Sequence, residues 1–142
     1  MPKFRCVVAI PTKELYSGEV DYAGIPGVDG DYGVLSGHES FVGLNRTGVL
    51  TLWFDPEGKE KAQFLIMGGA TQVLNSHLSV LPRFGCSVDE IDADQVKGEM
   101  EALKAQIAEI EREGGDAGES VSRTLVSESL AWCEAQLKAV GQ

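Results

Sequence analysis

The sequence is short of positive charge and has no long hydrophobic run. It carries 12 Lys and Arg residues against 22 Asp and Glu residues, a formal net charge of -10. So acidic a chain is poorly suited to bind nucleic-acid phosphates or anionic lipid surfaces, and neither is expected as a partner. No run approaches the roughly 20 apolar residues that cross a bilayer, and the opening residues show no cleavage site. The sequence therefore predicts neither a membrane span nor a signal peptide.

Reactive side chains are also few. The three cysteines, Cys6, Cys86 and Cys133, are odd in number, far apart and without a C-x-x-C pair. We expect them to be buried thiols rather than a disulfide framework or a metal site. The two histidines, His38 and His77, lie in separate turn regions, and no metalloprotease, nucleophile-elbow or Walker motif is present. The sequence therefore predicts a non-catalytic protein without a metal or a cofactor.

Charge and glycine content both change near residue 86. Residues 1–86 carry nine acidic and seven basic side chains, a net charge of -2, whereas residues 87–142 carry thirteen and five, a net charge of -8. Twelve of the 17 glycines lie in the first segment, where turns are therefore frequent. This contrast predicts two domains with the boundary between residues 86 and 87.

Short apolar runs separated by turn formers fill the first segment. The runs are Cys6–Ile10, Val20–Ile25, Val49–Phe54, Phe64–Met67, Thr71–Leu74 and Leu78–Leu81. Asp55–Gly58 is typical of a hairpin loop, Asn75-Ser76 of a tight reversal and Gly68-Gly69 of a turn. Many short strands at this spacing favour an all-β sandwich or barrel. Since some runs are apolar on both faces, we expect one face in the core and the other against the second segment or a partner.

The second segment changes to a helical period. Apolar residues recur at spacings of three and four along two stripes: Ala93, Val96, Met100, Leu103, Ile107 and Ile110, then Val126, Leu130, Cys133, Leu137 and Val140. Asp92 is the predicted N-cap of the first helix, Gly114–Gly118 the link, and Ser120 or Ser122 the cap of the second. The pattern predicts an antiparallel two-helix hairpin, whose small core must be covered by another surface.

Four sequence segments, in order, resemble one known family. They are Ser17–Val20, Pro26–His38, Phe41–Gly48 and Gly68–Val73, which read SGEV, PGVDGDYGVLSGH, FVGLNRTG and GGATQV. Together with the helical hairpin that follows, they resemble the ε subunit of the rotary F-type ATP synthase, whose mitochondrial counterpart is called δ. Each segment alone carries little weight, but the ordered set covers essentially the whole chain.

The resemblance implies both a fold and a place in an assembly. It implies a ten-stranded β-sandwich followed by a two-helix hairpin, in a non-catalytic subunit of the central stalk. Such a subunit binds the γ subunit, rests on the c-ring and couples ring rotation to ATP synthesis in the α/β head. Membrane association, at the cytoplasmic face of the bacterial inner membrane, would come only through the complex. A solitary ligand-binding or nucleotide-sensing sandwich and a hydrolase with an unrecognised site are the alternatives.

Particular residues follow from the matched motifs. The resemblance implies that Asp31 faces the polar loops of the c-ring and that His38 lies where γ and the ring meet. An exposed ion pair at Asp31 would fix the position of the subunit on the c-ring more than it would raise the affinity for the ring. The alternatives are that Asp31 is an ordinary turn acid and that His38 orders its own loop.

The chain departs from the family at two places in the hairpin. Many bacterial members of the family carry an ATP-binding signature that ends in arginine and alanine. The corresponding run here is Ile91–Val96, in which Gln95 replaces the arginine and Val96 replaces the alanine. Without the guanidinium we expect weak or no ATP binding. The second helix carries only Arg123 and Lys138 as bases, so docking on an acidic loop of the head, and inhibition of hydrolysis, should be weak. Arg123 is the best candidate for a residual head contact.

Overall fold

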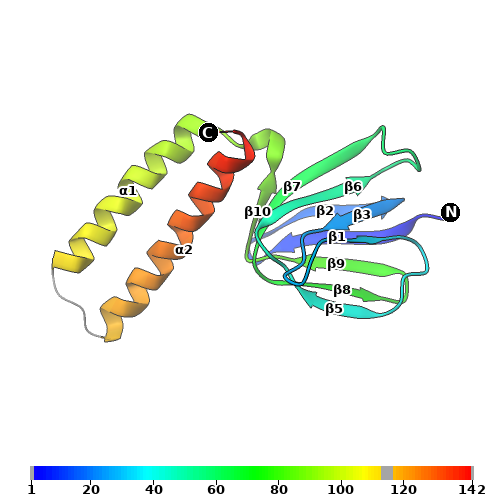
Figure 1. Cartoon of the computed structure of the whole chain (residues 1–142), viewed down its shortest axis with the longest axis horizontal. Coiled ribbons are helices and arrows are strands. Elements are labelled where there is room, and N and C mark those ends of the chain that lie inside the picture. Colours follow the sequence, from blue (N-terminus) through cyan, green and yellow to red (C-terminus); the bar gives the residue numbers. More distant parts are fainter. Residues whose placement is uncertain (1, 113–116, 142) are drawn as a thin grey trace. The chain divides into compact units, whose positions relative to one another are not determined.

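The computed structural model describes residues 2–112 and 117–141, without the side chains of residues 117–121. It divides into two compact units, Met1–Glu90 and Ile91–Gln142. The first unit holds ten strands in two sheets and a short 3-10 turn, Val88–Glu90 (η1), and the second holds two helices (Figure 1). The predicted β-sandwich followed by a helical hairpin is confirmed.

One sheet has five strands in the order β2-β1-β9-β8-β5. These strands are β1 (Phe4–Ile10), β2 (Lys13–Val20), β5 (Phe41–Leu44), β8 (Ala70–Leu74) and β9 (His77–Leu81). All neighbours are antiparallel except β1 and β9, which are parallel. Asn75 and Ser76 join β8 to β9 with φ angles of 51° and 62°. Positive φ at both positions is the geometry of a two-residue hairpin turn, which confirms the predicted reversal.

The second sheet is antiparallel throughout, in the order β10-β7-β6-β3-β4. Its strands are β3 (Tyr22–Ile25), β4 (Tyr32–Val34), β6 (Gly48–Trp53), β7 (Lys61–Met67) and β10 (Phe84–Ser87). The loop between β6 and β7 contains Asp55–Gly58, as predicted for a hairpin connection. The chain passes from β7 into β8 of the other sheet through Gly68 and Gly69, both at positive φ.

The core lies between the two sheets and is built by alternation along the strands. In β6, Leu50 and Leu52 are fully buried, whereas Val49 is 39% exposed. The buried cluster draws on both sheets: Phe4, Cys6, Val8, Val20, Ala23, Ile25, Val34, Leu50, Leu52, Phe64, Ile66, Val73, Leu78 and Val80. Burial of this apolar surface is the main favourable term for the sandwich.

The predicted strand Val20–Ile25 is wrong, because the run is divided between the sheets. Val20 ends β2, and Tyr22 begins β3 in the other sheet. Between them, the Asp21 carboxylate is only 8% exposed and accepts a hydrogen bond from Lys3 Nζ at 2.5 Å. The Asp21 amide also donates to the Trp53 carbonyl at 2.8 Å. A polar group that is both buried and paired fixes the point where the chain changes sheets.

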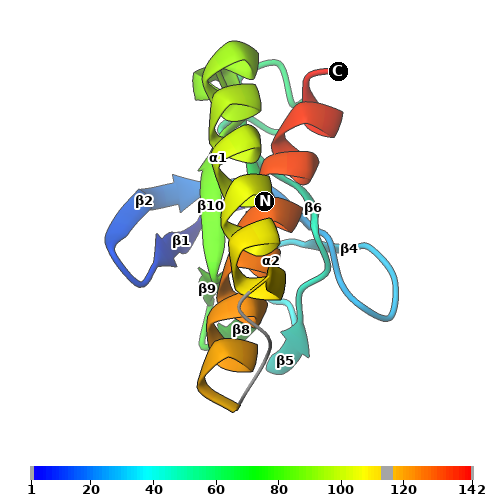
Figure 2. The same ribbon diagram turned by 90° about the vertical axis from the view of Figure 1, so that its left-hand side faces the viewer.

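The second unit is a hairpin of α1 (Ala93–Arg112) and α2 (Ala117–Ala139), which pack side by side and antiparallel (Figures 1 and 2). Val96 and Cys133, one from each predicted stripe, are buried. Asp92 Oδ1 accepts from the backbone amides of Asp94 at 3.1 Å and Gln95 at 3.2 Å. This confirms the predicted N-cap. Within the described ranges, neither helix combines the length and apolar character needed to cross a membrane.

The predicted start of the second helix is wrong. The helix begins at Ala117, so Ser120 and Ser122 lie inside it rather than at its cap. Helical hydrogen bonding extends through Gly118, because one glycine costs a helix only about 1 kcal/mol relative to alanine. Most of the predicted glycine link, residues 114–116, lies outside the described residues.

The contribution of the β6–β7 loop to stability depends on pH through the carboxyl group of Asp55. This carboxylate accepts from the backbone amides of Glu57, Lys59 and Glu60 at 2.8, 3.1 and 2.5 Å. These hydrogen bonds, chiefly that from Glu60, hold the pKa of Asp55 below its usual value. Since the folded-state pKa is lowered, the stabilisation is present above the unfolded pKa of about 3.9 and is lost as the pH falls through the folded pKa.

We therefore expect Asp55→Asn to unfold more readily than the parent at neutral pH and to lose less stability on acidification. Urea titrations at about pH 6 and about pH 3 measure this difference. Glu57→Gln is the matched control, because among the described residues the Glu57 carboxylate makes no hydrogen bond or ion pair. Identical acid sensitivity of parent and Asp55→Asn would contradict the prediction.

Candidate functional site

The Pro26–His38 segment forms the connections on either side of β4 and is tied to the end of β5. Gly27 and Asn45 form an isolated bridge, and the Val28 amide donates to the Leu44 carbonyl at 3.0 Å. A Cβ added at Gly27 would lie 2.6 Å from the Gly30 carbonyl oxygen, so glycine is required there. The loop is therefore held by backbone contacts.

Asp31 is engaged by an arginine of its own chain. Arg46 Nε lies 2.9 Å from Asp31 Oδ1, and the Arg46 NH2 nitrogen lies 2.6 Å from Oδ2, a bidentate pair. The Arg46 backbone amide also donates to the Pro26 carbonyl at 2.9 Å. The Asp31 side chain is 60% exposed, and each of its two oxygens accepts one hydrogen bond from Arg46. Arg46, which the sequence did not suggest, clamps the loop to the β5–β6 connection.

His38 orders its own loop. Its ring Nδ1 lies 2.7 Å from the Glu39 carbonyl oxygen, so Nδ1 is the donor of this hydrogen bond, and its amide donates to the Leu35 carbonyl at 3.1 Å. The ring meets Phe41 edge-on, with 6.3 Å between centroids. The structure thus contains the contact expected of a loop-ordering histidine, while the contact with γ and the c-ring stays a prediction.

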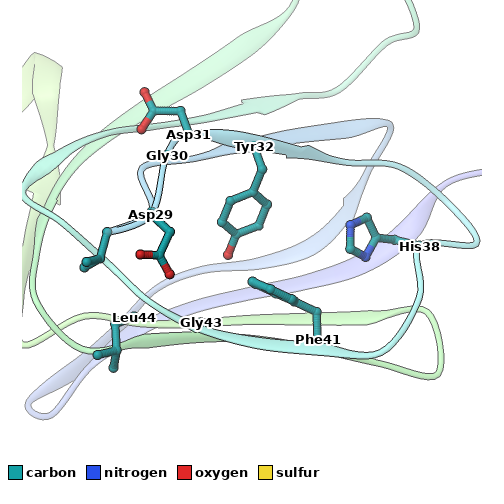
Figure 3. Close-up of a pocket in the computed structure, with 10 residues that line it drawn as sticks. Asp29, Gly30, Asp31, Tyr32, His38, Phe41, Gly43 and Leu44 are labelled. Carbon is teal, nitrogen blue, oxygen red and sulfur yellow. The ribbon is translucent and has the colours of Figure 1, made fainter.

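A hollow of about 380 Å³ lies between this loop and β5 (Figure 3). It is lined by Gly27, Val28, Asp29, Gly30, Asp31, Tyr32, His38, Phe41, Gly43 and Leu44. The Tyr32 and Phe41 rings meet edge-to-face with 5.0 Å between centroids. In Figure 3 the Asp29 carboxylate lies on the Tyr32 side of the hollow, and the Asp31 carboxylate turns away from it. The hollow thus combines aromatic surface with a carboxylate.

A buried polar network lies beside the Tyr32 hydroxyl. The Thr71 hydroxyl donates to Asn45 Oδ1 at 2.7 Å, and Asn45 Nδ2 donates to the Gly68 carbonyl at 3.1 Å. Burial raises the pKa of Tyr32, and the Thr71 hydroxyl opposes this by less. The Thr71 hydroxyl gives its proton to Asn45, and the shielded Tyr32 hydroxyl has no hydrogen bond of good geometry within the described residues. The network fixes Asn45, and through it the bridge to Gly27.

Apolar side chains are exposed beside the hollow. We call Val28, Val42 and Leu44, which are 58%, 67% and 66% exposed, the β5 patch. Leu44 pairs with Ala70, which in turn pairs with the half-exposed Leu81 on the same face of the sheet. A contiguous exposed group of this kind is typical of a protein-binding surface.

The predicted hairpin residues make contacts within the hairpin. Arg123 forms an ion pair with Glu111 at 2.6 Å, and both side chains are about half exposed. Asp92 caps α1, and the Gln95 amide lies 3.4 Å from Glu99 Oε1. Arg123 belongs to the second unit, whereas Asp31 and His38 belong to the first.

A sandwich with an exposed apolar patch beside a tethered loop is an arrangement typical of proteins that bind other proteins. A family model described as the β-sandwich domain of the ATP synthase delta/epsilon chain matches residues 3–85. The epsilon chain 1 of Nitrobacter hamburgensis and the epsilon chain of Nitrobacter winogradskyi are each 32% identical over 123 residues, covering 87% of this chain and 87% of theirs. The chain belongs to the ATP synthase epsilon chain family, as the sequence motifs predicted.

Solved structures agree on the fold. A chain of the Euglena gracilis mitochondrial ATP synthase, solved as an OSCP/F1/c-ring complex, superposes with a TM-score of 0.67 at 22% identity, covering 99% of this chain and 83% of that chain. A chain of the Tetrahymena thermophila mitochondrial ATP synthase central stalk/c-ring gives a TM-score of 0.54 at 19% identity, over 66% and 73% of the two chains. The first likeness extends over both units of the chain.

Proposed function

We propose that this chain is the central-stalk subunit that couples c-ring rotation to ATP synthesis in the catalytic head of an F-type ATP synthase. It performs no chemistry itself. Its partners are the γ subunit and the c-ring, with a weak contact to the α/β head through the hairpin. It is a peripheral protein at the cytoplasmic face of the bacterial inner membrane, held there only through the complex. Family membership and the central-stalk neighbour support this place.

The observation that carries the proposal is the β5 patch beside the tethered loop. Val42 and Leu44 are each about two-thirds exposed on the outer face of a two-layer sandwich whose core is complete without them. Exposed aliphatic side chains in a cluster gain free energy when a partner covers them. The patch adjoins the Pro26–His38 loop, in which Asp31 and His38 are the proposed contacts with the c-ring and γ.

The test is purification of the ATP synthase from the source cells through an affinity tag on the catalytic β subunit. The chain should copurify in a constant ratio to γ, and antibodies should detect it on the cytoplasmic side of inverted membranes. A complex that synthesises ATP normally after deletion of the chain's gene would refute the coupling role. ATP turnover by the purified chain alone would refute its non-catalytic character.

We expect ATP to bind weakly or not at all to the isolated chain. Asp92 is used as the N-cap of α1, and Gln95 supplies no guanidinium for a phosphate. Isothermal titration with ATP in the presence of magnesium measures this directly. Micromolar affinity would contradict the prediction, and a Gln95→Arg variant, which restores the family's arginine, is the matched comparison.

We expect removal of residues 88–142 to change ATP hydrolysis by the complex only slightly. The second helix supplies few bases for an acidic surface, and Arg123 is already paired with Glu111 inside the hairpin. Steady-state hydrolysis by complexes carrying the full-length and shortened chains measures the effect. A several-fold activation by the deletion would contradict the prediction.

A further inference from the structure

The edge strand β4 has no side chain at the centre of its outer face. It pairs with β3 at three positions, and the middle pair is Gly24 with Gly33. On the inner face Val34 is buried in the core. On the outer face two glycines supply no cross-strand side-chain contact, and such contacts are what stabilise neighbouring strands. A three-residue edge strand of this kind needs cover from another residue to keep its place.

The ring of Tyr22 supplies this cover. Tyr22 lies on β3 two residues before Gly24, so both face the outer side of the sheet, while Ala23 between them is buried. A Cβ added at Gly33 would lie 2.6 Å from Tyr22 Cε1, and one added at Gly24 would lie 3.4 Å from the Tyr22 hydroxyl oxygen. The ring therefore lies across both glycines. Aromatic cover of glycines is a known means of stabilising a sheet edge.

Tyr22 is itself held from the side by Trp53 of β6. The two residues are paired across the strands, and their ring centroids are 4.6 Å apart. The Trp53 ring also meets the β6–β7 loop, because a Cβ added at Gly58 would lie 2.7 Å from Trp53 Cε2. The Asp55 carboxylate closes that loop by accepting three backbone amides. A continuous series of contacts thus runs from the β6–β7 loop across the sheet to β4.

We propose that Tyr22 is a positioning residue for partner binding, because its ring holds β4 and with it the Pro26–His38 segment. β4 lies inside this segment, with Asp31 directly before it and His38 four residues after it. The proposal rests on the proposed function, because it takes γ and the c-ring to be the neighbours of the segment. Tyr22 acts through β4 and needs no contact with either partner.

Variants of the full-length chain, each bound to γ, test this role on immobilised, detergent-solubilised c-ring. Tyr22→Ala should weaken ring binding about fivefold, the effect of losing one cross-strand contact. Tyr22→Phe keeps the ring and should bind as the parent does. Tyr16→Ala is the matched control, because Tyr16 covers Gly18 in the same way on the edge strand β2 of the other sheet. It should lose stability but not ring affinity, and an equal loss of affinity in Tyr16→Ala and Tyr22→Ala would overturn the proposal.

Gly33→Ala is an independent test, since it displaces the Tyr22 ring without removing it. The φ angle of Gly33 lies outside the left-handed region, so alanine strains only the contact with the ring. A hollow of about 400 Å³ beside Tyr22 and Gly33 gives the ring space to move. Gly33→Ala should weaken ring binding in the parent and have no further effect in Tyr22→Ala. An equal effect in both backgrounds would show that Tyr22 is not the group that holds β4.

Amide hydrogen exchange separates local positioning from overall stability. In Tyr22→Ala the hydrogen-bonded amides of Tyr32–Val34 should exchange faster relative to those of β7. Equal acceleration in both strands would mean that Tyr22 contributes only to overall stability, which would contradict the proposal. Circular dichroism establishes that each variant is folded. If the parent binds neither γ nor the ring, the proposed function fails; if it binds both and Tyr22→Ala binds equally well, only the assignment of Tyr22 fails.

Discussion

Replacing Val42 and Leu44 together by lysine should abolish most of the chain's affinity for the central stalk without unfolding it. Both side chains are about two-thirds exposed, so the free chain should retain its parent stability within about 0.5 kcal/mol. In the complex, two lysines would replace apolar contacts and bury positive charge at an interface. We expect affinity to fall about a hundredfold, equivalent to about 2.7 kcal/mol.

Surface plasmon resonance with immobilised γ and c-ring measures this loss. The matched control is Leu125→Lys, which adds the same charge at an exposed leucine of the hairpin. The control should bind as the parent does. If the double variant bound the stalk with parent affinity, the β5 patch would not be a docking surface.

Among substitutions in the sandwich that add only one methyl group, Gly69→Ala should be the most destabilising. Gly69 has a φ of +72°, and a Cβ there would collide with the Leu81 carbonyl oxygen and lie 2.7 Å from Pro82 Cα. These are backbone atoms, so the β7–β8 turn or the end of β9 must move. The left-handed conformation alone costs about 1–2 kcal/mol, and with the displacement we expect about 3 kcal/mol or more.

Gly37→Ala provides the comparison, because it changes only the backbone preference. Gly37 has a φ of +83°, but no atom of a residue beyond its chain neighbours lies within 4 Å of the position that a Cβ would take. It should cost about 1 kcal/mol. Urea unfolding of both variants measures the difference, and equal destabilisation would mean that the contact at Leu81 is not a constraint.

Strands with a complete apolar run could be found from the sequence, whereas edge and polar strands could not. β6 and β7 are evident from Val49–Phe54 and Phe64–Met67, and both lie inside their sheet rather than at its edge. β2 lies at a sheet edge and is largely polar, and β4 has only three residues. Such strands are stabilised by pairing and cross-strand contacts more than by their own composition. Their number came from the family resemblance.

The division at Asp21 shows why a continuous apolar run is an ambiguous signal. Nothing in Val20–Ile25 marks a change of sheet, because the partner of Asp21 is Lys3, far away in sequence. The N-cap at Asp92 was predictable, since capping is a local interaction between a side chain and the next turn of the same helix.

The candidate site was predictable as a segment but not as a set of contacts. The motif places Asp31 and His38 in one loop region, and in the structure both residues are among those that line the hollow, although their contacts with a partner stay a prediction. Neither Arg46 nor Asp29 stood out, because an acid and a base fifteen positions apart form no local pattern. Only the pairing of the loop with the end of β5 brings Arg46 to Asp31 and leaves Asp29 beside the hollow.

The central claim is that this chain joins γ and the c-ring in one rotor. Size-exclusion chromatography of the full-length chain mixed with γ and solubilised c-ring from the same enzyme tests it most directly. We expect all three to elute together, with the chain shifted quantitatively into the larger species. Elution of the chain on its own, at concentrations up to about 50 µM and beside a γ–ring complex that forms without it, would contradict the claim.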